Sequence, residues 1–253
     1  MQLGLDGLKA VLAGASRGIG LATAEAFAEE GCAVAICARG QPGVDEAVAK
    51  IAAKGGAATG EAVDIADPQA YAAWVRGAAE GLGGCDIFIS FATGGGGAAS
   101  EETWRRTYEL DVLGLWRGVE TALPYLRASS AASVVAISST AALERFLAPQ
   151  AYNAMKAAVI NYAAELSQQL APEGIRVNTI SPGPVFVDGG SWDGVKQRNP
   201  ELYERTVQQI PAGRMASAAE VARAIAFVAS PACRSIIGAN LVIDGGFTKR
   251  VQY

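Results

Sequence analysis

Short runs of apolar residues recur along the chain and predict buried strands. Each run is nearly continuous rather than alternating with polar residues, which is the pattern of strands covered by helices on both faces of a parallel sheet. The predicted strands cover residues 8–13, 33–37, 58–63, 86–90, 133–138, 175–180 and 240–243.

Longer segments with helical character separate these runs, so that strand and helix alternate along the sequence. This alternation predicts an α/β fold of three layers, with helices on both faces of a central, mostly seven-stranded parallel sheet. No linker or shift in composition divides the sequence, so residues 1–253 are expected to form a single domain. The predicted helices are one that ends at Glu30, one opened by Pro68, and residues 44–54, 101–128, 150–170 and 217–229.

The composition is that of an acidic globular protein. Apolar residues make up 51% of the 253 residues and charged residues 18%, which excludes a disordered chain. The formal net charge is −4 and there is no basic run, which argues against nucleic acid and acidic membranes as partners. No stretch reaches about 20 uncharged apolar residues, and the amino terminus does not resemble a secretory signal.

Histidine is absent, which excludes every His-dependent catalytic triad and most zinc sites, and no metal site is predicted. The four cysteines are Cys32, Cys37, Cys85 and Cys233. None forms a C-x-x-C pair, and three of them lie in or beside apolar runs. We therefore expect reduced, buried thiols and a cytoplasmic protein.

A glycine-rich segment joins the first predicted strand to the first predicted helix, with glycines at Gly14, Gly18 and Gly20. Glycines in such a turn let the backbone approach a pyrophosphate, which then meets the free N–H groups of the helix N-terminus. A glycine triplet alone is a weak signal. Its place between a strand and a helix predicts a dinucleotide site.

Tyr152 and Lys156 lie four residues apart in a predicted helix, so their side chains share one face. An ammonium beside a phenol favours the phenolate, and such a tyrosine can exchange a proton with a ketone or an alcohol. The pair alone is a common surface pattern. It gains weight from the glycine loop and from Ser139, which stands thirteen residues before Tyr152.

These motifs, in this order and at these spacings, resemble the short-chain dehydrogenase/reductase family over nearly the whole chain. The resemblance implies a Rossmann-type fold and a nicotinamide-dependent oxidoreductase. It rests on the G-x-x-x-G-I-G loop, Asp64-Ile65, Ser139, Tyr152 with Lys156, Asn178 before Pro182-Gly183, and the closing G-A-N-L-V-I-D-G-G.

The resemblance implies a role for each residue of the reacting centre. Tyr152 would be the acid in reduction and the base in oxidation, Lys156 would hold the nicotinamide ribose, and Ser139 would donate a hydrogen bond to the substrate oxygen. It also implies that the cofactor contacts Gly14, Ser16, Arg17, Gly18, Ile19, Gly20, Arg39, Asp64, Ile65, Ala92, Gly94, Tyr152, Lys156, Pro182, Gly183 and Val185.

The end of the second predicted strand bears on the choice of cofactor. In the family an Asp at this place holds the ribose hydroxyls of NAD and repels a 2′-phosphate, whereas this chain has Ala38 followed by Arg39. A guanidinium can bind a phosphate through two hydrogen bonds, and Arg17 adds a second positive charge. The sequence therefore predicts NADP(H).

Two positions depart from the family pattern. Ser90-Phe91 replaces two asparagines after the fourth predicted strand. Asp111 stands where the family has a catalytic asparagine, and we count it among the catalytic residues. It could keep a backbone role, lie ionised beside Lys156, be protonated, or turn away toward Arg105 or Arg106. We expect an active enzyme with an altered pH profile.

Residues 184–213 are expected to form a lid, because the segment is irregular, partly helical and rich in large apolar side chains. Alternatively, half of those side chains only pack the segment onto the body. The lid predicts a small, mainly apolar ketone or secondary alcohol as the substrate. The predicted pocket residues are Gly95, Thr140, Ala141, Leu143, Phe146, Phe186 and Trp192.

Two other functions stay open at this point. One is reduction of a 3-oxoacyl group on acyl carrier protein or coenzyme A, for which a carrier protein would need a basic surface. The other is an NADP-binding protein with little turnover, motivated by Asp111 and Ser90-Phe91. The resemblance also implies a homotetramer. The arginines considered for a basic surface are Arg105, Arg106, Arg117 and Arg127.

Overall fold

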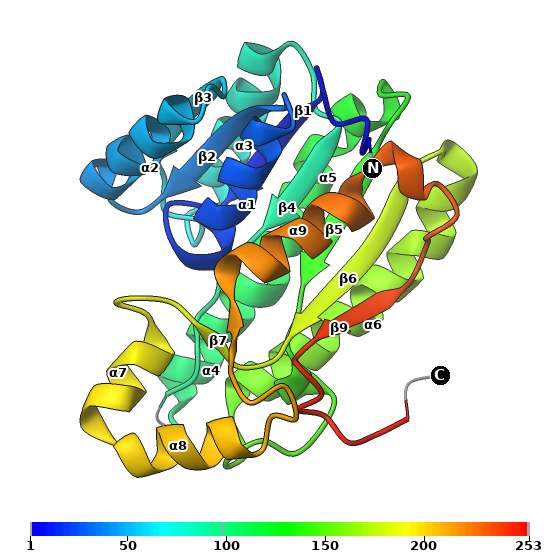
Figure 1. Ribbon diagram of the computed structural model, residues 1–253. Helices are drawn as coiled ribbons and strands as arrows, with labels where there is room; N and C mark the ends of the chain where they lie inside the picture. The colour runs from blue at the N-terminus through cyan, green and yellow to red at the C-terminus, as the bar shows by residue number, and fades with distance from the viewer. Residues whose placement is uncertain (1, 98, 252–253) are drawn as a thin grey trace.

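The computed structural model describes residues 2–97 and 99–251, and a seven-stranded parallel sheet forms its centre (Figure 1). The strand order is β3-β2-β1-β4-β5-β6-β9, so the chain begins in the middle of the sheet, builds one edge and returns to build the other. The predicted sheet is confirmed. Its strands are β1 Lys9–Ala13, β2 Ala33–Ala38, β3 Ala58–Ala62, β4 Ile87–Ser90, β5 Ser133–Ile137, β6 Arg176–Pro182 and β9 Asn240–Ile243.

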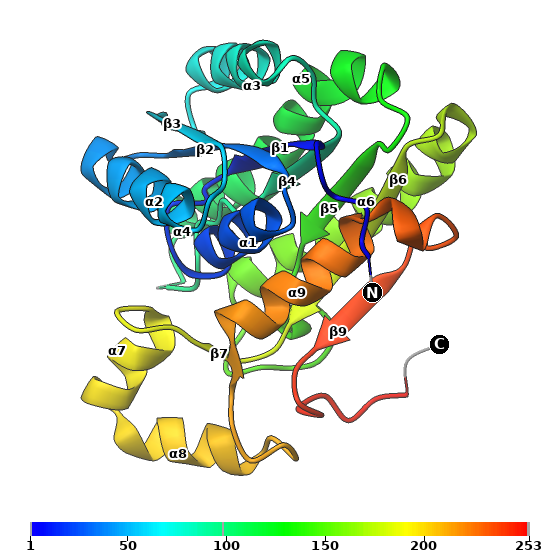
Figure 2. The same ribbon diagram turned by 45° about the horizontal axis from the view of Figure 1, so that its top comes forward.

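Helices cover both faces of the sheet and complete three layers (Figure 2). Successive strand residues point to opposite faces. Along β1, Val11 and Ala13 therefore pack in one apolar core, and Ala10 and Leu12 pack in the other. One face is covered by α1 Gly18–Glu29, α2 Gln41–Ala53 and α9 Ala218–Ala229, and the other by α3 Pro68–Leu82, α5 Gly114–Arg127 and α6 Ala151–Leu170.

The helix predicted over residues 101–128 is divided into three parts. These are α4 Glu101–Thr107, a π-helical turn Tyr108–Leu113 and α5. A π-helical turn holds one residue more than an α-helical turn and is frequent at functional sites. Here it carries Asp111, which is buried. Apolar periodicity alone does not distinguish this turn from the α-helix on either side.

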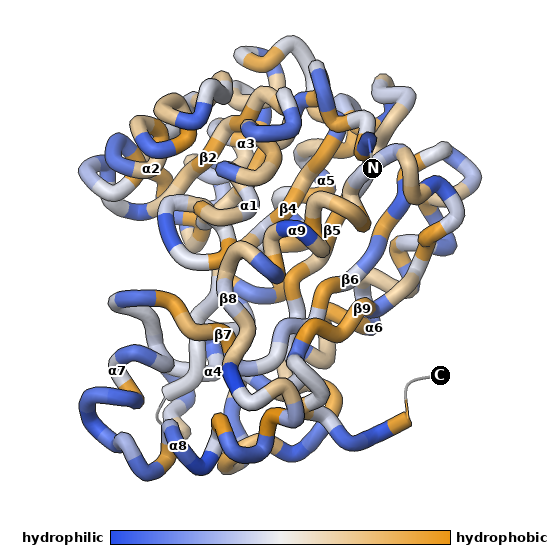
Figure 3. The backbone as a smooth tube through the Cα atoms, in the orientation of Figure 1, coloured by the Kyte–Doolittle hydropathy of each residue, from blue (hydrophilic) through white to orange (hydrophobic). Residues whose placement is uncertain are grey.

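Two helices, α7 Ser191–Arg198 and α8 Pro200–Gln208, stand away from the sheet beyond the carboxyl ends of its strands (Figure 1). Their surface is mainly hydrophilic (Figure 3). A two-stranded sheet that the sequence did not predict joins β7 Val185–Phe186 to β8 Ala216–Ser217. These strands flank the two helices and tie both ends of the segment to the body.

Within residues 2–97 and 99–251, no helix is both long and apolar enough to cross a membrane. All four cysteines are free thiols and buried.

Candidate active site

The carboxyl ends of the central strands bring most of the predicted site residues to one edge of the sheet. Gly14 follows β1, Ala92 follows β4, Ser139 follows β5, and Gly183 follows β6. In parallel α/β sheets, ligands bind outside this edge at the point where the strand order reverses. That point lies here between β1 and β4.

The glycine loop is shaped by close backbone contacts. Gly14 has a φ of +74°, and a Cβ atom there would lie 2.9 Å from the backbone nitrogen of Ala92. A Cβ atom on Gly20 would lie 2.7 Å from the Cα atom of Ala15. These glycines therefore let the first helix approach the loop and the end of β4 closely. Phe91 packs against Gly20, so the phenylalanine is accommodated within the groove.

The N-terminus of α1 is open to an anion. Arg17 is the N-cap residue, it is exposed, and its side chain makes no capping hydrogen bond. The N–H groups of the first turn consequently keep the capacity to bind a phosphate, and the helix dipole favours negative charge there. Ser16, Gly18 and Ile19 are partly exposed in the same loop. The residues present fit a dinucleotide pyrophosphate.

Arg39 lies at the rim of an open pocket of about 800 Å³, together with Asp64. It makes no hydrogen bond or ion pair within the described ranges, so its guanidinium is available to a ligand. Ile65 is buried in the core, and its side chain does not line the pocket. The rest of the pocket lining consists of Ala66, Glu101, Glu102, Arg105, Arg106, Glu109 and Leu110.

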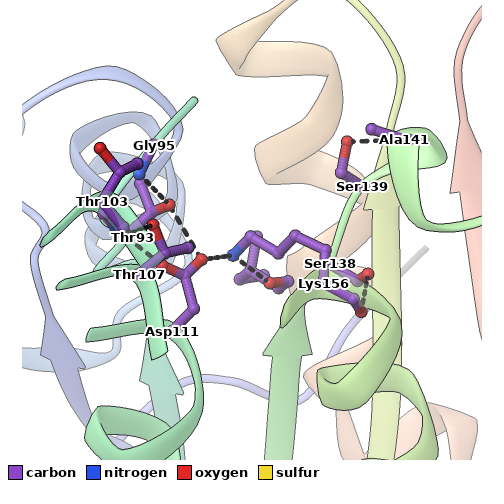
Figure 4. Close-up of polar contacts among 11 residues, drawn as sticks. Thr93, Gly95, Thr103, Thr107, Asp111, Ser138, Ser139, Ala141 and Lys156 are labelled. Carbon is purple, nitrogen blue, oxygen red and sulfur yellow. Dashed lines mark hydrogen bonds and ion pairs between the residues drawn. The ribbon is translucent and has the colours of Figure 1, made fainter. Parts of the chain in front are cut away.

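Lys156 reaches from α6 into a buried polar cluster (Figure 4). Its ammonium lies 2.9 Å from a carboxylate oxygen of Asp111 and donates a hydrogen bond of 2.9 Å to the carbonyl of Ile137. The Lys156 side chain is 5% exposed and that of Asp111 is 0% exposed. A buried charge is stable only when it is paired and hydrogen-bonded, and both conditions hold here.

Asp111 also fixes the loop after β4. One carboxylate oxygen accepts the Thr93 hydroxyl at 2.9 Å, and the other accepts the Gly94 N–H at 2.7 Å. Of the alternatives open for Asp111, the one in which it turns toward Arg105 or Arg106 is wrong. Asp111 therefore links Lys156 to the loop that carries Ala92 and Gly94.

Ser139 and Tyr152 stand next to this cluster. The Ser139 hydroxyl oxygen accepts the Ala141 N–H at 3.2 Å and caps a short turn after β5. The Lys156 ammonium lies 5.7 Å from the centre of the Tyr152 ring. The neighbouring Ser138 donates to the Lys156 carbonyl at 2.8 Å and anchors α6 to the end of β5. Lys156 therefore lies beside the Tyr152 ring, and α6, which carries both residues, packs against the turn that Ser139 caps.

The predicted substrate residues divide into two groups. The Phe146 and Trp192 rings lie 6.3 Å apart and join the segment after β5 to α7. Phe186 instead contacts the Tyr203 ring at 6.2 Å and lies under the Lys196 ammonium, so it packs the lid itself. The other predicted positions, Gly95, Thr140, Ala141 and Leu143, lie in the loops after β4 and β5, while Pro182 and Val185 lie on β6 and β7.

Sequence reasoning missed two contacts of the buried cluster. The Thr93 hydroxyl and the Ile137 carbonyl both bind partners there, and the sequence pattern predicts neither contact. No pattern points to the Ile137 carbonyl, because any residue supplies one. Within the described residues, no group of three His, Cys, Asp or Glu side chains is placed to hold a metal ion.

Comparisons with known proteins agree with this geometry. A family model described as enoyl-(acyl carrier protein) reductase matches residues 14–248. An isoepoxydon dehydrogenase of Penicillium expansum is 36% identical over 100% of this chain and 99% of its own length.

Two solved structures are also similar. An L-sorbose reductase from Gluconobacter frateurii, complexed with NADPH and L-sorbose, has a TM-score of 0.90 and 29% identity, covering 99% of this chain and 100% of that one. A 7α-hydroxysteroid dehydrogenase, complexed with NADH, has a TM-score of 0.90 and 29% identity, covering 97% of this chain and 96% of that one. The chain belongs to the short-chain dehydrogenase/reductase family, whose members use a nicotinamide cofactor.

Proposed function

We propose that this protein is an NADPH-dependent oxidoreductase of a ketone or secondary alcohol, with Tyr152 as proton donor and acceptor. The observation that carries the proposal is the buried Lys156 beside the Tyr152 ring, on a helix that packs against the turn capped by Ser139. When bound, the nicotinamide supplies or accepts the hydride. The chain's own groups orient the substrate, exclude water and move one proton.

Each residue of the centre has a separate task in this proposal. The Ser139 hydroxyl donates a hydrogen bond to the substrate oxygen and stabilises the charge that develops on it. The Tyr152 hydroxyl gives its proton to that oxygen in reduction and takes it back in oxidation. Lys156 donates to the nicotinamide ribose hydroxyls. Its position is held by Asp111 and the Ile137 carbonyl.

The preference for NADPH rests on Arg39 and Arg17. Both are exposed, and β2 ends in Ala38, so no carboxylate at that strand end repels a 2′-phosphate. A solved relative binds NADPH and another binds NADH, so residues of this chain must decide the choice. We expect Arg39→Ala to raise the KM for NADPH about tenfold while the KM for NADH stays within about twofold. Unchanged affinity for NADPH would remove this assignment.

The substrate is proposed to be a small, mainly apolar ketone or secondary alcohol. Residues 184–213 are proposed to form a lid over it, and the whole chain is proposed to form one domain. A screen of carbonyl compounds that follows NADPH absorbance tests this directly. The screen should compare three classes of compound, namely cyclic ketones, sugars and 3-oxoacyl thioesters. Reduction confined to sugars would contradict the apolar pocket.

Reduction of a 3-oxoacyl group remains the second candidate, since the matching family model carries an acyl-carrier-protein name. The arginines on α4 and α5 give it little support. Arg105 pairs with Glu101, Arg117 with Glu109, and Arg127 with Glu173, so their charges are compensated. Faster turnover of a 3-oxoacyl thioester than of any simple ketone would favour this candidate.

A protein with little turnover is the rival from another class, and the pairing of Asp111 with Lys156 favours it. The Asp111 carboxylate pairs with the Lys156 ammonium, which would otherwise interact only with Tyr152 and the nicotinamide ribose. Asp111→Asn should change the pH dependence of the rate and keep the enzyme active. An unchanged pH–rate curve would contradict the altered profile. NADPH binding without turnover of any carbonyl compound would support the rival.

We further propose a cytoplasmic homotetramer. The free, buried cysteines suit a reducing compartment. Trp104, Tyr108 and Trp116 are each more than 40% exposed on α4, the π-helical turn and α5, which suits a surface that pairs with a second copy. The mass in solution, measured by light scattering, decides the assembly. A monomer at micromolar concentration would contradict it.

A further inference from the structure

A second pocket, of about 290 Å³, lies between three segments that are distant in the sequence. They are the loop after Ser139, helix α8 and the C-terminal segment after β9 (Figure 1). Thr140, directly after Ser139, lines its floor, and Phe146 lines its wall. We call it the tail pocket. None of the roles proposed above uses it.

The tail pocket is held together by specific bonds. One carboxylate oxygen of Glu144 accepts the N–H groups of both Lys249 and Arg250 at 2.8 Å. The buried Asp244 accepts the N–H of Thr248 at 2.8 Å and its hydroxyl at 2.7 Å. The C-terminal segment is therefore fixed against the loop after β5, and the pocket between them is a formed feature of the fold.

The lining of the tail pocket carries excess positive charge. Arg145, Arg205 and Lys249 line it, with Glu144 as the only acid in the lining. None of the three cationic side chains makes a hydrogen bond or ion pair within residues 2–97 and 99–251. By contrast, Arg105, Arg117, Arg127 and Arg214 each pair with a carboxylate. Three uncompensated cations in one pocket of a chain with net charge −4 form a local site for an oxyanion.

The tail pocket is coupled to the reacting centre by short links. Asn153, the residue after Tyr152, donates a hydrogen bond of 3.3 Å to the Phe146 carbonyl. The Phe146 ring contacts Phe247 at 5.8 Å and Trp192 at 6.3 Å. Thr140 and Phe146 thus belong to the predicted substrate pocket and to the tail pocket alike. The tail pocket therefore borders the segment that follows Ser139.

We propose that the tail pocket binds a carboxylate of the substrate, so that the preferred substrates are ketones or secondary alcohols that also carry an acid group. The apolar ring or chain of such a molecule would lie against Phe146, which lines the tail pocket. Arg145 and Arg205 present planar donor groups that suit a carboxylate, and Lys249 adds a third positive charge. The carbonyl group of the substrate in this proposal rests on the proposed function. The binding of the substrate carboxylate does not depend on that function.

A matched pair of substrates tests the proposal by turnover. The probes are 4-oxocyclohexanecarboxylate and its methyl ester, which differ in charge at the acid. We expect a kcat/KM at least about tenfold higher for the acid, and the variant Arg145→Gln/Arg205→Gln to lose about tenfold for the acid and less than about twofold for the ester. Arg234→Gln, an exposed arginine outside the pocket, is the matched control. Equal rates for acid and ester would overturn the proposal.

A binding measurement separates this proposal from the proposed function. Titration calorimetry of cyclohexanecarboxylate into the protein saturated with NADP⁺ requires no turnover. Saturable binding that is lost in Arg145→Gln/Arg205→Gln and kept in Arg234→Gln supports the pocket even if neither ketone is reduced. Absence of saturable binding, or equal binding by both variants, overturns the pocket even if other ketones are reduced.

Discussion

The two ends of the active site are built in different ways. At the glycine loop, backbone meets backbone at distances that leave no room for a Cβ atom on Gly14 or Gly20. Around α7 and α8, by contrast, side chains meet side chains, as Phe186 does with Tyr203. The first arrangement tolerates almost no substitution, whereas the second can change its residues and keep its shape. Between them lies the buried pair of Lys156 and Asp111.

The buried pair should give the largest effect on stability. Asp111→Ala leaves the Lys156 ammonium buried without its carboxylate and removes the acceptor for Thr93 and Gly94. We expect a loss of about 3–5 kcal/mol in the free energy of unfolding. Chemical denaturation measures it. The exposed pair of Lys50 and Glu46 is the control, since Glu46→Ala should leave the stability nearly unchanged. Equal losses in the two variants would show that burial of the pair adds nothing.

The glycine loop should give the next effect. Gly20→Ala forces a Cβ atom to 2.7 Å from the Cα atom of Ala15, and we expect a loss of about 1–3 kcal/mol together with weaker NADPH binding. Gly77 lies inside α3 with no atom within 4 Å of an added Cβ. Gly77→Ala should therefore be neutral or stabilise by up to about 1 kcal/mol. If Gly20→Ala and Gly77→Ala change the stability equally, close packing around Gly20 does not explain why glycine is required there.

The same contrast explains what the sequence could predict. Backbone geometry requires Gly14 and Gly20, and proton chemistry calls for Ser139, Tyr152 and Lys156. The spacing between these residues is visible in the sequence alone. The strands were predicted to within two residues at each end, for most of them because burial requires continuous apolar runs. The exception is β3 at the edge of the sheet, which is largely exposed.

The π-helical turn and the tail pocket could not be predicted from the sequence. The π-helical turn at Tyr108–Leu113 depends on where Asp111 finds its partners, which no local pattern encodes. The tail pocket depends on three segments that are at least 38 residues apart in sequence. Contacts of this kind follow from the whole fold, and residue types such as arginine or phenylalanine occur in many other roles.

The lid should show a smaller effect, confined to the substrate. Trp192→Ala removes the ring that contacts Phe146. We expect the KM for the carbonyl substrate to rise about tenfold, while the KM for NADPH changes by less than about twofold. Steady-state kinetics with each reactant varied in turn measures both. A rise in the KM for NADPH alone would place Trp192 on the cofactor side.

The buried thiols of the core should give the smallest effect at neutral pH, because their contribution to stability changes only in alkali. Burial raises the pKa of Cys32, Cys37 and Cys85 to about 12. The unfolded chain loses these protons near pH 8.5 and the folded chain does not, so stability falls as the pH rises from about 9 to 12. Each thiol contributes up to about 1.4 kcal/mol per pH unit. Denaturation at pH 8 and pH 10 measures the fall, which Cys37→Ala should reduce; a flat pH dependence would contradict it.

The central claim is that Tyr152 moves the proton while the rest of the site binds NADPH. Tyr152→Phe removes one hydroxyl and leaves the glycine loop, Arg39 and Lys156 in place. Turnover of the best carbonyl substrate and the dissociation constant of NADPH should be measured on the same preparation. The account predicts a loss of turnover of at least about a thousandfold, with NADPH affinity within about threefold of the parent protein. A Tyr152→Phe protein that still reduces the substrate at a comparable rate would contradict the account.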